Sequence, residues 1–291
     1  MTFSLANAGR RETLPGGIDL RGVRARTLAL GLVSLGVICA IALGAAMTGD
    51  DGLGTHLLAK KLPPSWDFPF GTDPLGRDMA IRTLKGLALS LRVGVIASFA
   101  SSLIALVLAL AAATLGSTVD HMVGVLVDTF FAVPHLVLLI LVSFALGGGT
   151  SGVIVAVAVS HWPRITRVLR AEILQVLSSD YVRVAHGFGR SPFKIAVEHL
   201  VPHLIPQVLV GFLLLFPHAI LHEAGLTFLG FGIEPNRPAV GILLAESMRY
   251  LTAGYWWLAV FPGLSLLLMV LAFDGLAAGA KALVSPREAQ D

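Results

Sequence analysis

The sequence has little charge and almost no cysteine. Only 13% of its 291 residues are charged, where a soluble domain carries roughly 25%. Hydrophobic residues make up 55% of the chain, and the mean hydropathy is +0.82. These values exclude an ordinary soluble domain and predict a multi-pass membrane protein. The single cysteine, Cys39, lies within an apolar run, which excludes an intrachain disulfide and a cysteine-rich metal site.

Motifs for catalysis and for nucleotide binding are also missing. The sequence contains no Gly-x-x-x-x-Gly-Lys-Ser/Thr, no Gly-x-Ser-x-Gly and no His-Glu-x-x-His. We therefore expect the chain to bind no cofactor and to catalyse no reaction itself. The net charge of +3 is small and spread along the chain, so nucleic-acid binding is not expected either.

Apolar runs of about 20 residues each predict membrane-spanning helices. Six such spans are expected. Five lie at about residues 27–48, 93–115, 122–146, 195–222 and 255–271, and the fourth in chain order starts at about residue 153 and continues as a helix past Arg170. The fold class is thus all-α, with one membrane domain over residues 27–284. A basic tail at residues 1–26 precedes it, and a polar tail at residues 285–291 follows it. Pro134 should kink the third span.

The placement of basic residues predicts the orientation. With both termini in the cytoplasm, thirteen of the 21 lysines and arginines fall on inner segments. This is a mild excess in the direction of the positive-inside rule.

A polar stretch at residues 172–202 separates the fourth and fifth spans and is too polar to lie in hydrocarbon. Its apolar residues recur at helical spacing from Ser179 onward. Ser179 and Asp180 suit a helix N-cap, and Gly187 and Gly189 suit a helix end. The pattern predicts a short amphipathic helix at about residues 178–190, outside the membrane.

The same stretch resembles the EAA signature of the membrane subunits of bacterial ABC importers. Asp180, Val184-Ala185, Gly189 and Val201-Pro202 stand at its characteristic positions. Val184 replaces the usual Ala, and Asp180 replaces a frequent Glu. The resemblance implies that this helix is the coupling helix, which docks on an ATPase subunit. The implied coupling residues are Ser179, Asp180, Tyr181, Arg183, Val184, Ala185, Gly187, Gly189 and Arg190.

A second motif lies in the polar connection after the first span. In residues 70–78, FGTDPLGRD, Thr72-Asp73-Pro74 predicts a turn and Asp78 a helix cap. An amphipathic helix at the membrane interface is expected after it, up to Leu91. The string resembles the opening of the second permease subunit of dipeptide, oligopeptide and nickel importers. The motif residues are Gly71, Thr72, Asp73, Gly76, Arg77 and Asp78.

Residues 223–232, EAGLTFLGFG, resemble the run that follows the fifth span in the same family. The alternation of glycine with large apolar residues suits a re-entrant turn packed against protein. The resemblance places Glu223, Phe228 and Gly230 at the outer mouth of the pathway.

Several histidines and one acid are candidates for a site. His218 and His222 share a helix face next to Glu223, a combination that can bind a transition metal. The alternative is that they are polar residues at the membrane boundary. Asp128 is an ionisable group at membrane depth, with either a functional role or a hydrogen bond to a facing helix.

The resemblance implies a fold like that of type I ABC importer permeases, in a bacterial inner membrane. It implies a homologous second permease subunit, two cytoplasmic ATPase subunits that bind ATP-Mg, and an external binding protein. The substrate would be a peptide or a nickel or other metal chelate. The alternatives are a self-contained secondary transporter or channel, which would need intramembrane charges or paired broken helices, and a membrane-embedded enzyme.

Overall fold

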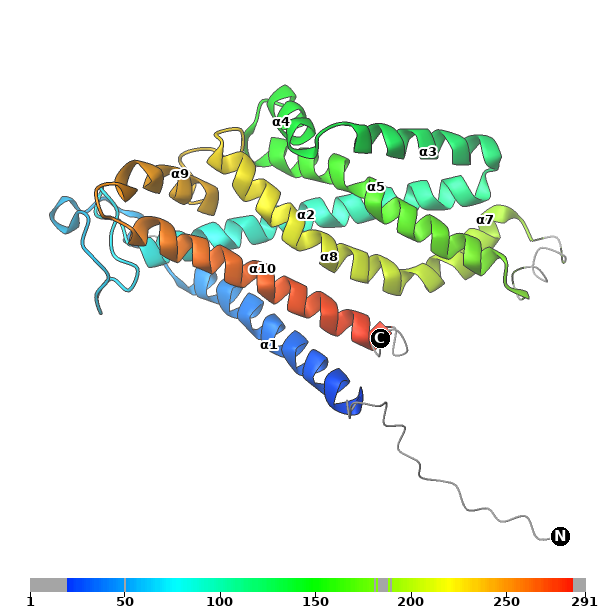
Figure 1. Ribbon diagram of the computed structural model, residues 1–291, viewed down its shortest axis with the longest axis horizontal. Helices are drawn as coiled ribbons and strands as arrows, with labels where there is room; N and C mark the ends of the chain where they lie inside the picture. The colour runs from blue at the N-terminus through cyan, green and yellow to red at the C-terminus, as the bar shows by residue number, and fades with distance from the viewer. Residues whose placement is uncertain (1–19, 50, 181, 183–187, 189, 285–291) are drawn as a thin grey trace, which may run out of the picture.

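The protein is built from α-helices (Figure 1). The computed structural model describes residues 20–49, 51–180, 182, 188 and 190–284. Within these residues there is no β-strand, only an isolated bridge between Thr72 and Asp78. The predicted all-α class is therefore confirmed.

The long helices run roughly side by side along the molecule (Figure 1). They are α1 (Leu20–Met47), α2 (Met79–Thr114), α3 (Ser117–Ala132), α5 (Gly149–Leu177), α8 (Val201–Phe228) and α10 (Trp257–Val284). The shorter helices are α4 (His135–Ala145), α7 (Pro192–Ile195) and α9 (Val240–Leu251), with a π-helical turn at Ala196–Leu200 and 3₁₀ turns at Asp51–Leu53 and Leu57–Ala59.

Four helical stretches in the described part of the chain are long and apolar enough to cross a membrane. The bent pair α3–α4 makes a fifth if it is counted as one span. Helix α5 has 29 residues, enough to cross, but its second half carries Arg164, Arg167 and Arg170. The count of six spans therefore stays a prediction.

Several boundaries differ from the prediction. Helix α1 begins at Leu20, so the end of the expected basic tail is helical. The expected interfacial helix is wrong as a separate element, because α2 continues without a break from Met79 to Thr114. Helix α9 was not predicted. Pro134 does more than kink the third span, since α3 and α4 meet there at 97°.

Helix α2 packs against α5 and α8 through small residues. Ala97, Ala105 and Ala109 are fully buried there, and Leu169 and Ile173 of α5 share the core with the last two. Between helices in lipid, small side chains allow close contact and thus more van der Waals attraction. The alanine content of α2 therefore explains its central place in the bundle.

Helices α1 and α10 lie side by side (Figure 1) and approach most closely at two glycines. A Cβ on Gly31 would lie 3.1 Å from the Cα of Gly279, and a Cβ on Gly279 would lie 3.0 Å from the Cα of Gly31. Backbone cannot move aside as a flexible side chain can. These glycines therefore fix the distance between the two helices.

We predict that Gly31→Leu destabilises the protein by about 1–3 kcal/mol, the usual cost of overpacking. The thermal unfolding midpoint of the purified protein in detergent measures the effect. Gly36→Leu is the matched control, because Gly36 lies on the same helix with open space around it and gains the same helix propensity. Equal midpoints for the two variants would contradict the proposed close contact.

Candidate functional site

A cavity of about 640 Å³ opens among α3, α4, α5 and α8 and is called the histidine cavity here. Much of its wall is apolar, including Phe131, Val168 and Leu214. The polar side chains that line it are His135, Ser160, His161, Arg164, Gln207, His218, His222 and Asp274. An apolar pocket with a few convergent polar groups is the usual form of a small-molecule site.

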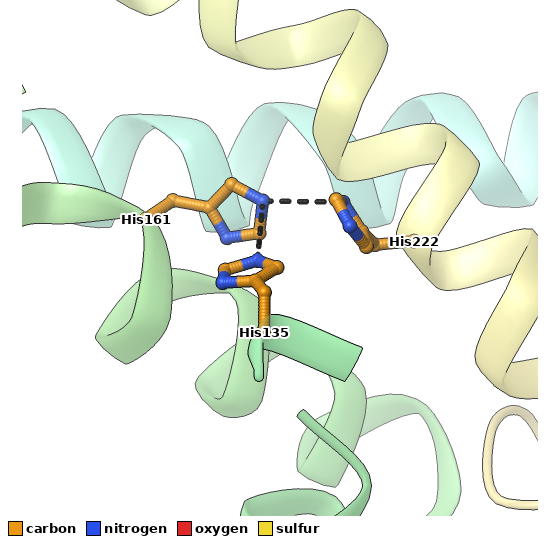
Figure 2. A group of neighbouring side chains, drawn as sticks. All are labelled: His135, His161 and His222. Atoms are coloured by element: carbon orange, nitrogen blue, oxygen red, sulfur yellow. Dashed lines mark hydrogen bonds between the residues drawn. The ribbon is translucent and has the colours of Figure 1, made fainter. Parts of the chain in front are cut away.

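Three of these histidines meet within the cavity wall (Figure 2). The Nε2 atom of His161 lies 3.3 Å from Nε2 of His135 and 3.3 Å from Nδ1 of His222. One possible ligand nitrogen from each ring lies within 4.8 Å of the other two. His161 is buried, and the other two are half-buried. These three side chains, the histidine triad, could hold a transition metal.

The predicted trio of His218, His222 and Glu223 does not form one site. His218 is exposed, and its Nδ1 lies 3.3 Å from the carbonyl oxygen of Leu214. It lines the cavity outside the triad. His135 and His161 were not predicted as site residues, because they lie far from His222 in the chain. Only their occurrence as isolated histidines in apolar helices marked them.

Glu223 lies away from the triad, inside the bundle, with none of its surface exposed. It accepts hydrogen bonds from Ser90 Oγ at 2.5 Å and from Thr227 Oγ1 at 3.0 Å. Thr227 Oγ1 in turn accepts one from the backbone N–H of Ile233 at 3.1 Å. Glu223 therefore connects α8 to α2 and, through Thr227, to the turn that follows α8.

The three residues expected together at the pathway mouth therefore do not lie at one place. Glu223 through Phe228 are helical, so the expected re-entrant turn is wrong for this part. Phe228 and Gly230 line a second cavity of about 960 Å³, which Glu223 does not reach. Gly230 has a φ of +87°, a conformation that glycine adopts without strain.

Glu234 fastens the turn after α8 to the start of α5. Its carboxylate accepts hydrogen bonds from Thr150 Oγ1 at 2.8 Å and from the Thr150 backbone N–H at 3.3 Å. A hydrogen bond from its own backbone N–H and those from Thr150 lower the pKa of Glu234. A lowered pKa means that the contact stabilises the fold while the carboxylate is ionised. Its contribution is lost as the pH falls through the folded-state pKa.

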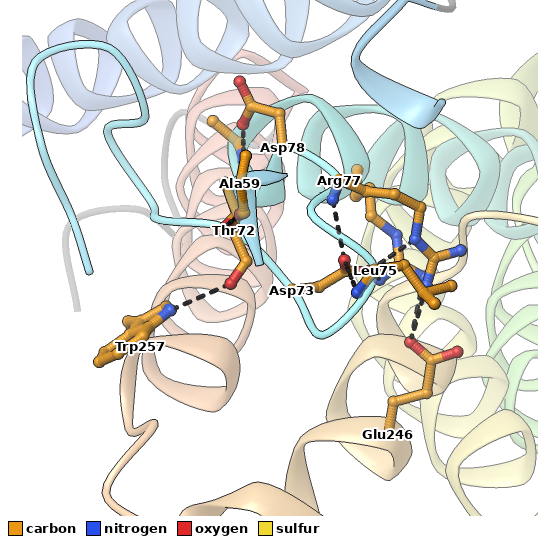
Figure 3. Close-up of polar contacts among 10 residues, drawn as sticks. Ala59, Thr72, Asp73, Leu75, Arg77, Asp78, Glu246 and Trp257 are labelled. Atoms are coloured by element: carbon orange, nitrogen blue, oxygen red, sulfur yellow. Dashed lines mark hydrogen bonds and ion pairs between the residues drawn. The ribbon is translucent and has the colours of Figure 1, made fainter. Parts of the chain in front are cut away.

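The outer motif is organised by the carboxylate of Asp73, which is only 1% exposed (Figure 3). Its Oδ1 accepts the backbone N–H groups of Leu75 at 2.8 Å and Arg77 at 2.9 Å. Its Oδ2 accepts Arg77 Nε at 2.6 Å and Arg82 Nη1 at 2.7 Å. Arg82 also donates to Glu246 at 3.1 Å, which links the loop and α2 to α9.

The other motif residues shape the loop. Thr72 Oγ1 donates to the carbonyl oxygen of Ala59 at 2.5 Å and accepts the N–H of Leu62 at 2.8 Å. The predicted cap is confirmed, because Asp78 accepts the N–H of Ala80 at 2.7 Å at the start of α2.

Gly71 and Gly76 have φ values of +71° and +77°. A Cβ on Gly76 would collide with the backbone of His56. The motif therefore builds a rigid loop. Its partners Arg82 and Glu246 were not predicted.

We predict that Asp73→Asn destabilises the protein by about 1.5–3 kcal/mol, because it gives the buried guanidinium of Arg82 a neutral acceptor in place of a charged one, while Glu246 stays as its second partner. Glu246→Gln serves for comparison. The Glu246 side chain is 45% exposed, and an exposed pair contributes about 0–1 kcal/mol. Thermal unfolding in detergent measures both variants. A larger loss for Glu246→Gln would show that Asp73 is not the centre of the network.

At the opposite end of the molecule, charged pairs hold α3 against α5. Asp128 accepts a hydrogen bond from Arg167 at 2.5 Å, so the expected hydrogen bond to a facing helix is confirmed. Asp120 accepts hydrogen bonds from Arg170, one of them at 2.5 Å from Nη2.

The predicted coupling segment follows α5 at this end. Ser179 Oγ donates to the carbonyl oxygen of Val176 at 2.5 Å, and Asp180 is helical. Val182 is buried in the same core as Ile173 of α5. Arg190 pairs with Glu198 at 2.8 Å. The remaining coupling residues, Tyr181, Arg183, Val184, Ala185, Gly187 and Gly189, lie outside the described residues.

Comparison with known proteins identifies the family. The model of the family described as binding-protein-dependent transport system inner membrane component matches residues 89–286. The dipeptide transport system permease protein DppC of Bacillus subtilis is 32% identical over 231 residues, which cover 79% of this chain and 72% of that protein. The oligopeptide transport system permease protein OppC of the same organism is 30% identical over 266 residues, covering 91% and 87%.

A di/tripeptide transport system permease protein, DppC of Pseudomonas aeruginosa, is 32% identical over 231 residues, covering 77% of this chain and 76% of that protein. The chain therefore belongs to the family of inner-membrane components of binding-protein-dependent transport systems. Its recognition as a permease subunit of an ABC importer is confirmed. Members of this family are transport permeases, so the chain is a non-catalytic, multi-pass membrane subunit.

Proposed function

We propose that this chain is one of two homologous permease subunits in an ATP-driven importer of small peptides. An external binding protein would deliver the peptide, and two cytoplasmic ATPase subunits would bind ATP-Mg. The observation that carries the proposal is the similarity to permease proteins named for dipeptide and oligopeptide transport, over 72% and 87% of their lengths. A metal chelate is the second candidate substrate, and the histidine triad is the observation that favours it.

The lining of the histidine cavity supports the proposal of a second permease subunit. Its rim carries the exposed apolar side chains of Phe131, Val168 and Leu214, while Arg164 and Asp274 in the same lining are exposed and ionisable. Facing hydrocarbon, such groups would cost several kcal/mol. A facing subunit would cover the apolar rim and enclose the polar lining as a pathway.

Two ends of the molecule support the proposed sidedness. The outer motif and α9 lie at one end, and the C-terminal end of α5 and helix α7 lie at the other (Figure 1). Arg164, Arg167 and Arg170 occupy the half of α5 toward the second end, which the positive-inside rule assigns to the cytoplasm. With six spans, both termini would also be cytoplasmic.

We predict opposite sidedness for two exposed residues, Trp66 and Phe188. Each is replaced by cysteine in a Cys39→Ser background, so that the new thiol is the only one in the chain. A membrane-impermeant maleimide added to spheroplasts should label Trp66→Cys at once, but Phe188→Cys only after lysis. Labelling of both thiols in intact spheroplasts would contradict an arrangement with residues 178–190 in the cytoplasm.

Two features of the predicted coupling segment support the proposal that an ATPase subunit docks there. An isolated helix as short as this segment is marginal in water, where about 12–15 residues are needed. Val182 packs on the core of this chain, whereas Phe188 is 85% exposed. A partner on the exposed side would bury this aromatic ring and stabilise the helix.

We predict that Asp180→Lys lowers co-purification of the ATPase and ATP-dependent uptake of a labelled dipeptide at least tenfold, equivalent to about 1.4 kcal/mol. The lysine removes a carboxylate that favours the N-terminus of the helix. Gln175→Lys is the matched control, because it places a lysine at another exposed position, near the end of α5. It should retain both ATPase co-purification and dipeptide uptake. Gly189→Val should behave like Asp180→Lys, because Gly189 is expected to end the coupling helix.

Two outcomes would overturn the proposal. Normal docking and normal uptake in both variants would show that residues 178–190 are not the coupling element. Uptake by proteoliposomes that contain this chain alone, without ATPase and ATP, would instead identify a self-contained transporter.

A further inference from the structure

The three histidines of the triad come from separate elements. His135 is the first residue of α4, next to the break at Pro134, His161 lies within α5, and His222 lies within α8. Along the chain, His135 is 26 residues and His222 is 61 residues away from His161. Side chains from three packed elements can meet at one point only if the fold brings them there.

The nitrogen spacing matches metal coordination. Two imidazole nitrogens, each about 2.0–2.1 Å from a zinc ion at the tetrahedral angle, lie about 3.3 Å from one another. The Nε2 atom of His161 lies 3.3 Å from Nε2 of His135 and 3.3 Å from Nδ1 of His222. All three ligand nitrogens lie within 4.8 Å of one another, so the third distance, between His135 and His222, would shorten toward about 3.3 Å when one ion is bound.

The hydrogen bonds of His161 set its tautomer. Its Nδ1 lies 2.9 Å from the carbonyl oxygen of Val157 and 2.9 Å from Ser160 Oγ. A carbonyl oxygen only accepts, so Nδ1 carries the proton and Nε2 keeps its lone pair toward the other two rings. Ligand histidines in metal sites are typically oriented by such a hydrogen bond from the second ring nitrogen.

One competing contact involves His222. Its Nδ1 also lies 2.7 Å from the carbonyl oxygen of His218, one turn earlier on α8. Coordination through Nδ1 would replace this hydrogen bond, whereas coordination through Nε2 would keep it. As for His161, the carbonyl oxygen places the proton of His222 on Nδ1, so coordination through Nδ1 needs the other tautomer of this ring.

We propose that His135, His161 and His222 bind a divalent transition-metal ion, with a fourth position open to the histidine cavity. The cavity has room for that ligand, at about 640 Å³, and both Asp274 and Arg164 lie in its lining. Water can fill the fourth position, and so can the amine or amide nitrogen of a small peptide. The site does not depend on peptide transport, because three ligands come from this chain.

Co²⁺ is the probe, since its visible absorption reports coordination. The intact transporter complex, purified through a tag without histidine and stripped with a chelator, is titrated with Co²⁺ and then with competing Zn²⁺. We expect one saturable site per copy of this chain, with the intense bands of a four-coordinate ion. His222→Ala should weaken binding by more than the ~10–100-fold that follows loss of a supporting outer partner.

His218→Ala is the matched control, because His218 lines the same cavity one turn away but lies outside the triad. It should leave Co²⁺ affinity unchanged. His222→Cys should retain binding and add a sulfur-to-cobalt charge-transfer band, which a merely structural role for His222 would not produce. His135→Ala repeats the test on another element, in case one variant folds poorly.

The triad could bind a free metal ion or a metal–peptide complex. Titration with Co²⁺ alone and with glycylglycine present distinguishes the two. A spectral shift on addition of the dipeptide identifies a metal–peptide complex as the ligand, and an unchanged spectrum identifies the free ion. The proposal is overturned if wild type binds no more Co²⁺ than the triple alanine variant. It is also overturned if His218→Ala and His222→Ala lose affinity equally.

Discussion

Hydrocarbon offers no hydrogen-bond partner, so a polar group inside this bundle is stabilised by a partner within the protein or by water. Among the described residues, four buried hydroxyls of α2, those of Thr83, Ser98, Ser101 and Ser102, have no partner within this chain. Three buried contacts show how the chain meets this constraint. Asp73 gathers Arg77 and Arg82, and Glu223 accepts a hydroxyl from Ser90 on another helix. Arg82 joins the loop to α2 and Ser90 joins α2 to α8, whereas Arg77 lies only four residues from Asp73. The polar residues of this apolar protein therefore determine which helices pack together and in which register.

At the histidine cavity, this chain alone does not shield its polar groups from hydrocarbon. Its ionisable groups and its exposed apolar rim lie on one surface. A complete apolar surface would suit lipid, and a complete polar surface would suit water, but this mixture suits neither. It fits a protein that forms half of a pathway. The same reasoning explains why the break at Pro134 is tolerated, since irregular backbone at membrane depth is stable where it lines a cavity.

Local signals predicted local structure well. Asp78 caps α2 as its position before an apolar helix indicated, and Pro134 interrupts the third span because it lacks an N–H group. Contacts between distant segments carried no such signal. The meeting of His135, His161 and His222 depends on how α4, α5 and α8 pack, and nothing in the spacing of the residues records that packing. Helix α9 was missed because it has only 12 residues, too few for a membrane span.

Helix α5 connects the two parts of the molecule that transport would have to couple. It carries His161 in the wall of the histidine cavity and ends at Leu177, directly before residues 178–190 of the predicted coupling helix. Val182 shares a core with Ile173 on that helix. A packed helix moves as a rigid body, so displacement of the segment by an ATPase would be passed to the cavity wall through α5. The pairs of Arg167 and Arg170 with α3 would carry the same displacement to the bent pair α3–α4, whose break lies beside the triad.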